Sequence, residues 1–295
     1  MRKTKDLPFQ IITGVIFFLF MLICIYPFYY LLIVSMSDSL ASDKGLVYLW
    51  PVKFTLQYYK QTFALKGIAQ SFFISISRSV LGTAISVFMS AMFAYTITKL
   101  ELPGRKLFYR ATVMTMYLNS GLIPWFITMK TYGLADNFLL YILPGAISAF
   151  SVILIKTYME SLPVGLEESA FIDGAGMFSI FVRIALPLSK PVLAAIGLFT
   201  AVGQWNSWQD NFFLVSAPNL QTLQKVLMDL LRQAEAIANM IKTGQAGMAA
   251  MATHRMTPFT AKTTITMITV IPIICVYPFL QKYFVKGMLV GAIKG

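Results

Sequence analysis

Residues 167–191 read EESAFIDGAGMFSIFVRIALPLSKP, a polar and patterned segment between two long apolar stretches. Two adjacent acids open the segment, small residues and phenylalanines follow, and two prolines close it. Acidic residues suit the first turn of a helix because they complement the partial positive charge at its N-terminus. The segment therefore predicts a short helix at about 163–180, which ends before the prolines where the chain enters the next apolar stretch.

The predicted helix has the composition of a docking element. Its small residues form a face that another surface can approach closely, and its phenylalanines project as aromatic knobs. A helix that lies on lipid carries Lys and Arg on its polar face, whereas the polar residues here are Glu167, Glu168 and Asp173. The pattern favours a helix seated in a groove of another protein over a helix lying on a membrane surface.

The composition of the whole chain is that of a membrane protein. Of its 295 residues 57% are hydrophobic and 12% are charged, and the mean hydropathy is +0.70, whereas about a quarter of a soluble domain is charged. The net charge of +12 raises the possibility of nucleic-acid binding, but the basic residues lie in short clusters between apolar runs, as in the loops of membrane proteins. Cys24 and Cys275 lie within apolar runs, so no disulfide framework is indicated.

Six segments reach the length of about 20 apolar residues that a helix needs to cross a bilayer. They are Ile11–Met36, Ala69–Ile97, Leu107–Met129, Leu139–Tyr158, Pro191–Gln209 and Thr263–Tyr283. The first segment resembles a signal peptide, but the uncharged run from Leu7 to Ser37 exceeds the roughly 7–15 apolar residues of such peptides. We therefore predict an all-α polytopic membrane protein, with one transmembrane domain over residues 1–295.

The distribution of basic residues predicts the orientation of the spans. Lys and Arg are denser in the short segments that lie on the same side as the N-terminus, which places both termini and residues 167–191 in the cytoplasm. A long segment at about 208–262 then lies outside. Within it, residues 221–241 have apolar side chains at helical spacing, which predicts an amphipathic helix. This helix is either a packing scaffold or a surface for a partner.

The spacing inside residues 167–191 resembles a known signature. Glu168-Ser169-Ala170, three residues, Gly174, nine residues and then Ile184-x-Leu186-Pro187 is similar to the EAA signature of ABC importer permeases, with Ser169 in place of an alanine. The chain also closes with YPFLQKYFVKGMLVGAIKG. Over essentially its whole length it resembles the carbohydrate, maltose-type branch of that family, especially the oligosaccharide and lipoprotein-assisted relatives.

The resemblance implies the type I importer permease fold, with a cytoplasmic coupling helix that sits in a cleft of an ATP-binding subunit. The coupling residues that it implies are Glu167, Glu168, Ser169, Ala170, Asp173, Gly174, Ile184, Leu186 and Pro187. The implied partners are a second homologous permease, two ATP-binding subunits and an extracytoplasmic sugar-binding protein, at a bacterial cytoplasmic membrane. An acidic oligosaccharide such as an alginate fragment is one cargo that the resemblance suggests.

The chain itself has no motif for catalysis. No G-x-x-x-x-G-K-[ST] loop occurs to hold nucleotide phosphates, and His254 is the single histidine. We expect no enzymatic site, cofactor or metal in this chain, so that ATP and Mg²⁺ would bind to the partner ATPase subunits.

Polar and aromatic residues near membrane depth are candidates for the sugar pathway. They are Arg78, Asn119, Trp205, Asn206, Trp208 and Asp210. The two tryptophans suit stacking on sugar rings or an interfacial aromatic belt, and Asn119 suits either a cavity or a hydrogen bond between helices. Arg78 has three alternatives: it binds an acidic sugar, it snorkels outward, or it pairs with the second permease.

Two other classes of membrane protein compete with the importer. An ion-coupled secondary transporter needs an acid inside a span, and none of the six predicted spans contains Asp or Glu. A membrane scaffold leaves the spacing of the EAA-like signature unexplained.

Overall fold

The computed structural model describes residues 7–118, 120–243 and 257–292, and the regular elements within them are all helical. The longer helices are α1 (Leu7–Ser35), α4 (Ile68–Thr98), α5 (Arg105–Tyr117), α6 (Leu122–Thr131), α7 (Ala149–Met159), α11 (Lys190–Asn206), α13 (Leu223–Lys242) and α15 (Pro258–Ala292). The shorter ones are α2 (Ser39–Asp43), α3 (Gln57–Phe63), η1 (Phe138–Tyr141), α8 (Gly165–Ile172), α9 (Met177–Ile180), η2 (Phe181–Ala185), α10 (Leu186–Leu188), α12 (Gln209–Leu214) and η3 (Pro218–Leu220). The predicted all-α class is confirmed.

Three of the described helices are long and apolar enough to cross a membrane. They are Phe9–Ser35, Ile68–Thr98 and Pro258–Cys275, which confirms helices at the first, second and sixth predicted spans. Met177–Leu188 and Lys190–Asn206, which meet at 80°, are long and apolar enough only when taken together, and the count is four when this bent pair is taken as one span. The predicted count of six spans is not confirmed.

The prediction of continuous helices at the third and fourth spans is wrong. The third breaks between α5 and α6, where Gly121 has a φ of +80°. The ring of Pro124, in the first turn of α6, would clash with a helical carbonyl four residues earlier, so a helix cannot continue through it undisturbed. The fourth breaks between η1 and α7, where Pro144 and Gly145 interrupt the helical pattern.

The chain forms two compact units, whose boundaries fall between α3 and α4, inside α13 and inside α15. Unit 1 comprises the described residues of Met1–Lys66 and Leu227–Pro272, and unit 2 those of Gly67–Val226 and Ile273–Gly295. In unit 1 the side chains of α1 are exposed over most of the helix. A helix that is apolar on every side is typical of a surface that faces lipid or another apolar partner.

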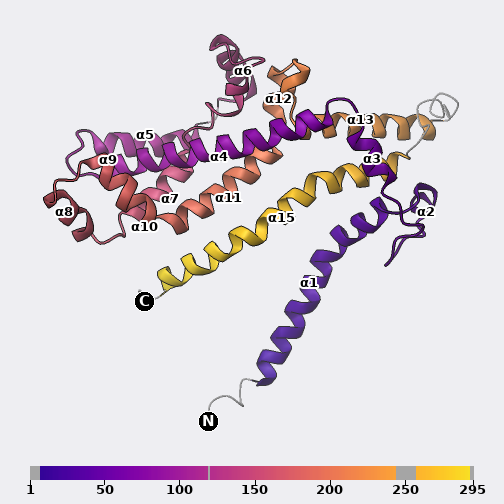
Figure 1. Cartoon of the computed structure of the whole chain (residues 1–295), viewed down its shortest axis with the longest axis horizontal. Coiled ribbons are helices and arrows are strands. Elements are labelled where there is room, and N and C mark those ends of the chain that lie inside the picture. The colour runs from indigo at the N-terminus through magenta and orange to yellow at the C-terminus, as the bar shows by residue number, and fades with distance from the viewer. Residues whose placement is uncertain (1–6, 119, 244–256, 293–295) are drawn as a thin grey trace. The chain divides into compact units, whose positions relative to one another are not determined.

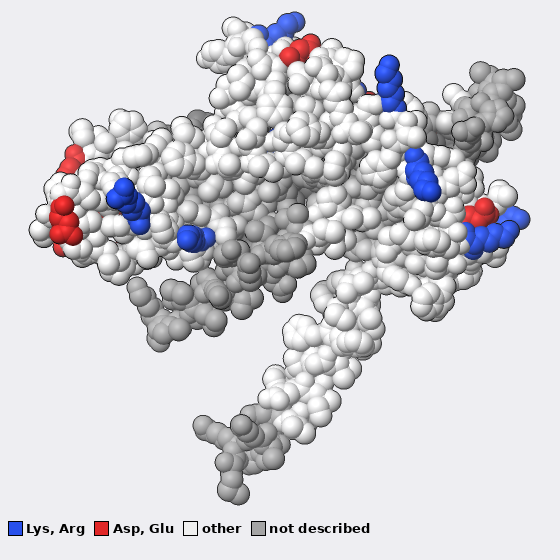
Figure 2. All heavy atoms as spheres, in the orientation of Figure 1, with Lys and Arg blue, Asp and Glu red and all other residues white. Residues whose placement is uncertain are grey.

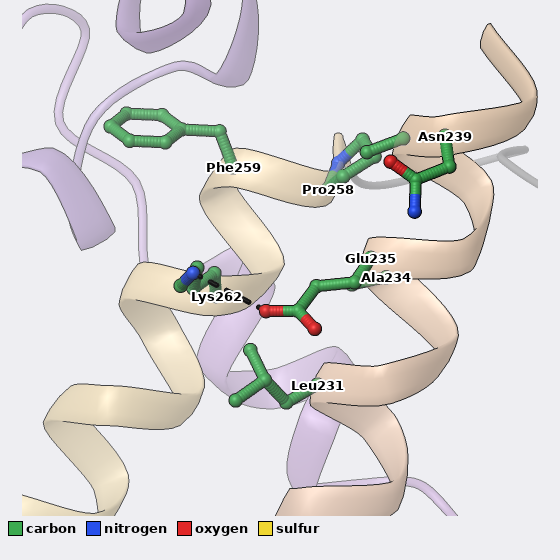
Figure 3. A pocket seen from close by; sticks show the side chains of 8 residues that line it. Leu231, Ala234, Glu235, Asn239, Pro258, Phe259 and Lys262 are labelled. Atoms are coloured by element: carbon green, nitrogen blue, oxygen red, sulfur yellow. Dashed lines mark hydrogen bonds and ion pairs between the residues drawn. The ribbon is translucent and has the colours of Figure 1, made fainter. Parts of the chain in front are cut away.

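The predicted amphipathic helix is confirmed as α13. Leu223 and Leu227 are buried, while the opposite face carries exposed polar residues. Within unit 1, α13 and the start of α15 line an open pocket of about 530 Å³. Figure 3 shows Glu235 and Lys262 pointing toward one another across it, with 3.4 Å between Oε1 and Nζ. Both side chains are more than half exposed, so this ion pair contributes little stability.

In unit 2, α7 and α11 pack along α4 (Figure 1). The buried face of α4 consists mainly of small residues that repeat about once per turn. They are Ser71, Ser75, Gly82, Ser86, Ser90 and Ala94. Small side chains let helix backbones approach closely, which is the usual way to pack helices where lipid supplies no hydrophobic driving force. The hydroxyl of Ser90 also accepts the backbone N–H of Ser148 at 3.1 Å, just before α7 begins.

Two glycines in this packing have different surroundings. A Cβ at Gly82 on α4 would lie 2.8 Å from Nε2 and 3.0 Å from Cδ of Gln204. Gln204 is not free to move away, because its Oε1 accepts a hydrogen bond of 2.8 Å from Arg78 Nε. A Cβ at Gly197 on α11 would be 3.9 Å from Thr83 and Val87, which is ordinary contact.

This difference gives a prediction for two matched substitutions. We expect Gly82→Ala to destabilise the protein by about 1–3 kcal/mol, since the added methyl overpacks a held side chain. Gly197→Ala should be neutral or stabilising by up to ~1 kcal/mol, since alanine favours helix more than glycine does. Thermal unfolding of the purified chain in detergent measures both, and equal stability of the two variants would contradict the packing described here.

Candidate functional site

The segment with the EAA-like spacing begins as an exposed helix. α8 spans Gly165–Ile172, with Glu167 and Glu168 in its first turn. Large apolar side chains are exposed on and beside it, and we call them the apolar tip: Val164, Leu166, Phe171, Ile172 and Phe178. Ile172 is 85% exposed. Exposed apolar side chains that gather beside acids are typical of interaction surfaces.

Gly174 ends α8 by a conformation that favours glycine. Its φ is +81°, in the left-handed region where other residues are strained. The N–H of Gly174 donates to the carbonyl of Phe171 at 3.0 Å, and that of Ala175 to the carbonyl of Ala170 at 2.9 Å. These two bonds form the Schellman motif that closes helices. The segment predicted as one helix at 163–180 is therefore two short helices, α8 and α9, joined at this glycine.

The two acids that open α8 have different surroundings. Glu167 forms an ion pair with Lys99, which directly follows α4, and both side chains are partly buried. Glu168 is exposed, and no ion pair to it occurs in the described residues. Figure 2 shows few charged side chains on this face of the molecule, with acidic atoms over α8 at the left of the view. Glu167 therefore pairs with a residue of its own chain, whereas the side chain of Glu168 is exposed.

Residues 177–188 connect the exposed helix to the core. Ile180, Phe181 and Ala185 are buried in a cluster with residues of α4 and α7. The turn η2 is π-helical and precedes Pro187, which lacks an N–H and would clash with the carbonyl four residues earlier in a regular helix. The chain then bends by 80° between Leu188 and Lys190 into α11. The Ile184-x-Leu186-Pro187 part of the spacing thus lies at a bend held by buried side chains.

A groove opens beside this segment. It has a volume of about 470 Å³ and lies between the end of α4 and α9. Its lining is mainly apolar, with one basic and one acidic side chain: it includes Met92, Tyr95, Lys99, Glu101, Phe178 and Phe181. The groove and the apolar tip share Phe178, so they form one continuous surface.

A second site lies around Arg78, which is 4% exposed on α4. Its Nη1 donates to Asp210 Oδ1 at 3.1 Å, and its Nη2 pairs with Asp210 Oδ2. Nε donates to Gln204 Oε1 at 2.8 Å, and Nη1 also donates to the carbonyl of Ser207 at 3.3 Å. The guanidinium lies 4.6 Å from the ring centroid of Tyr141, a cation–π distance. The charge is therefore compensated within the chain.

Comparisons with known proteins decide the family. The chain is 37% identical over 274 residues to Protein LplC of Bacillus subtilis, covering 92% of this chain and 90% of that protein. It is 34% identical over 281 residues to the polygalacturonan/rhamnogalacturonan transport system permease protein YtcP of the same organism, covering 94% and 95%. The chain belongs to the ABC sugar-transport permeases. No family model matches it.

A solved structure supports the fold of this permease. The permease superposes with a TM-score of 0.82 and 32% identity, over 96% of its length and 99% of the other chain, on a chain of a bacterial ABC transporter involved in the import of the acidic polysaccharide alginate. At this identity the likeness shows common descent as well as a common fold. The resemblance inferred from residues 167–191 is therefore confirmed.

The structure brings together some of the predicted pathway residues of this permease and separates others. Arg78 and Asp210 are in contact. Trp205 is 8% exposed and packs edge-to-face on Phe72 at 6.0 Å between ring centroids. Trp208 is half-buried beside Phe212, and the exposed Asn206 accepts a hydrogen bond from Gln224. Asn119 lies outside the described residues.

Three residues of these sites were not predicted from the sequence. Lys99 binds Glu167, Gln204 binds Arg78, and Tyr141 lies under the guanidinium. Lys99 and Gln204 each end a long apolar run, which is the one signal that marks them in the sequence. Tyr141 follows a turn and has no sequence signal that separates it from other aromatic residues.

Two phenylalanines of residues 177–188 differ in burial and give a prediction. Phe181 is 1% exposed, with ring centroids 5.2 Å from Tyr95 and 5.9 Å from Phe88. We expect Phe181→Ala to destabilise the permease by about 3–5 kcal/mol, as for other buried aromatic residues. Phe178 is 65% exposed, and Phe178→Ala should cost about 1 kcal/mol or less. Thermal unfolding in detergent tests both, and a larger loss for Phe178→Ala would disprove this assignment of core and surface.

Proposed function

We propose that this permease forms, with a second homologous permease, the translocation pathway of a heteromeric ATP-driven importer for an oligosaccharide. One observation carries the proposal: a helix with one outward acid, Glu168, and exposed apolar side chains is joined, through a buried bend, to a helix packed along α4. Such a segment receives force from another protein and passes it to the membrane part. ATP hydrolysis then belongs to two separate subunits, and a sugar-binding protein outside the bacterial cytoplasmic membrane delivers the cargo.

The coupling surface is assigned to the apolar tip with Glu168, Ser169 and Asp173. A carboxylate at a protein contact forms charge-assisted hydrogen bonds, which are stronger than neutral ones. The small side chains of Ser169 and Ala170 permit close approach to a cleft. Gly174, Ile184, Leu186 and Pro187 set the turn and the bend behind this surface and are assigned to transmission of the motion.

An acidic oligosaccharide is the proposed cargo class. Two of the similar proteins are named for acidic polymers, at 34% and 32% identity. Relatives named for arabinooligosaccharides or alpha-glucosides are 24–29% identical. Uronic acid chains such as fragments of alginate or polygalacturonan are therefore favoured over neutral sugars.

Ion-coupled secondary transport is the alternative function, and the geometry gives it little support. Such a transporter needs a carboxylate that exchanges an ion during transport. Asp210 is the acid that lies nearest to a predicted span, and Arg78 already compensates its charge.

Uptake by the complete complex in proteoliposomes tests the function and the cargo class. We expect ATP-dependent uptake of oligogalacturonate or oligoalginate with the binding protein present, accompanied by faster ATP hydrolysis, and no uptake of maltotriose. Uptake driven by an ion gradient without ATP would reject the importer. ATP-dependent uptake of maltotriose alone would keep the importer and reject the acidic cargo.

The two acids of α8 supply a matched pair for the coupling surface. Glu168→Lys should weaken binding of the ATP-binding subunits by about tenfold or more, because a reversed charge at a docking contact costs at least ~1.4 kcal/mol. Glu167→Gln should change this binding by less than about threefold, since it removes only a partly exposed pair within the chain. Binding to the purified permease in nanodiscs measures both. If Glu168→Lys bound the ATPase normally, the coupling assignment would fail.

A further inference from the structure

The charge of Arg78 lies where an uncompensated charge is costly. α4 begins at Ile68, so Arg78 is about three turns, or ~15 Å, along the helix. Ionisable residues at membrane depth face a cavity or pair with other groups, and they mark functional positions. Arg78 is buried at 4% exposure, and the side chain of Asp210 is 13% exposed.

The guanidinium has almost no free hydrogen-bonding capacity. Arginine has five N–H donors, and four of these have acceptors on Gln204, Ser207 and Asp210. The side-chain amide of Gln204 is itself confined by close contact with Gly82. A sugar carboxylate that bound Arg78 bidentately would have to displace Asp210 first.

Asp210 joins Arg78 to the end of α11. Its Oδ1 accepts the hydroxyl of Ser207 at 3.3 Å and the N–H of Asn211 at 2.8 Å, besides Arg78. Ser207 follows the last residue of α11, and Asp210 and Asn211 lie in the first turn of α12. The carboxylate therefore fixes the turn between these helices against α4.

The contacts continue from Asn211 into the following connection. Asn211 is fully buried, and its Nδ2 donates to the hydroxyl of Tyr141 at 2.7 Å. Its Oδ1 accepts the N–H of Thr222 at 3.1 Å. The hydroxyl of Tyr141 donates to the carbonyl of Leu220 at 2.7 Å. The polar contacts thus extend from α12 to η1 and to the residues before α13.

The network returns to α4 one turn from where it starts. The N–H of Leu223 donates to Ser75 Oγ at 2.8 Å, and both residues are buried. Ser75 and Arg78 lie three positions apart on the same face of α4. A ring of buried and partly buried polar contacts, closed through the peptide bond between Thr222 and Leu223, therefore holds the connection from α11 to α13 on a single turn of α4. We call it the α4 ring.

We infer that Arg78 and Asp210 are a positioning pair, which anchors the end of α11 and the connection at 207–222 to α4 during transport, and that Arg78 does not bind the sugar carboxylate. The inference rests on the proposed function, because it concerns how force applied at α8 reaches the far end of α11. With the end of α11 anchored, a displacement at the bend near Leu188 moves α4 and α11 together. Without the anchor, the same displacement is absorbed by the connection.

The test compares Arg78→Gln, Asp210→Asn and the double variant in the complete importer in nanodiscs. Gln70→Ala is the matched control, since Gln70 also joins α4 to this connection, by a 2.9 Å bond to the carbonyl of Asn219, but lies outside the α4 ring. The readouts are the KM and maximal rate of uptake with oligogalacturonate and oligoalginate, and amide hydrogen exchange of residues 207–222.

Each single variant should lower the maximal rate by about tenfold or more, with KM changed by less than about threefold, because it leaves one buried charge without its partner. Amide exchange at 207–222 should rise in both single variants. The double variant is neutral at both positions, so its maximal rate should be at least about threefold higher than that of either single variant. Gln70→Ala should behave as the wild type.

A different pattern would overturn the inference. If Arg78→Gln raised KM about tenfold or more while Asp210→Asn changed neither KM nor amide exchange, Arg78 would bind the sugar. If both single variants failed to assemble and the double variant assembled, the pairing would be supported. If all three failed, Gln204→Ala, which removes a neutral partner of Arg78, should lower the maximal rate with KM unchanged, and a raised KM would overturn the inference.

The test of the Arg78–Asp210 anchor can succeed or fail independently of the test of the proposed function. If the wild-type importer took up none of the sugars, the proposed cargo would be rejected. Amide exchange would then still decide whether Arg78 and Asp210 anchor the connection.

Discussion

The close packing of α7 and α11 on α4 is the constraint on which unit 2 depends. Residues without large side chains cover most of the contact face of α4, which allows the helices to approach closely. Arg78 lies on that same face, and its charge could not be buried there without compensation. The end of α11 and the turn after it supply the compensation, so the packing of the helices and the path of the connection are set together.

The two ends of α11 are held in different ways. At the start of α11, Pro187 and the π-helical turn before it produce a bend whose side chains are buried with α4 and α7. At the end of α11, Gln204 and Asp210 hold Arg78. The first contact is apolar and allows the sliding movements that packed helices undergo, whereas the second is directional and charged. This asymmetry suits a helix that is moved from one end and keeps its register at the other.

The family and the apolar helices could be predicted from the sequence because each is marked by a local pattern of residues. The EAA-like spacing is gapless, and α1 and α4 are long apolar runs. The prediction of continuous helices failed where helix-breaking residues interrupt an apolar run. Gly121 with Pro124, and Pro144 with Gly145, divide runs that are apolar enough to span a bilayer. Hydropathy averages over about 20 residues, so a single left-handed glycine or a proline is hidden in it.

The partner of Arg78 was missed for a related reason. The predicted spans contain no acid, and Asp210 directly follows the fifth one. The structure ends α11 at Asn206 and turns the chain back, so that a residue 132 positions from Arg78 meets it. Local periodicity carries no information about such a contact. The two acids of α8 were treated alike for the same reason, since the pairing of Glu167 with Lys99 spans 68 positions.

The compensation of Arg78 has a consequence for how the proposed acidic cargo would be recognised. A guanidinium paired with a carboxylate contributes little net charge, so it attracts an anionic cargo only weakly at distances beyond direct contact. If the cargo is the proposed uronic acid chain, its selection depends on donors other than Arg78, either in this chain or in the proposed partner proteins. Within this chain, the buried pair of Arg78 and Asp210 holds the geometry of the helices, and Glu168, the acid of α8 that faces outward, belongs to the proposed coupling surface.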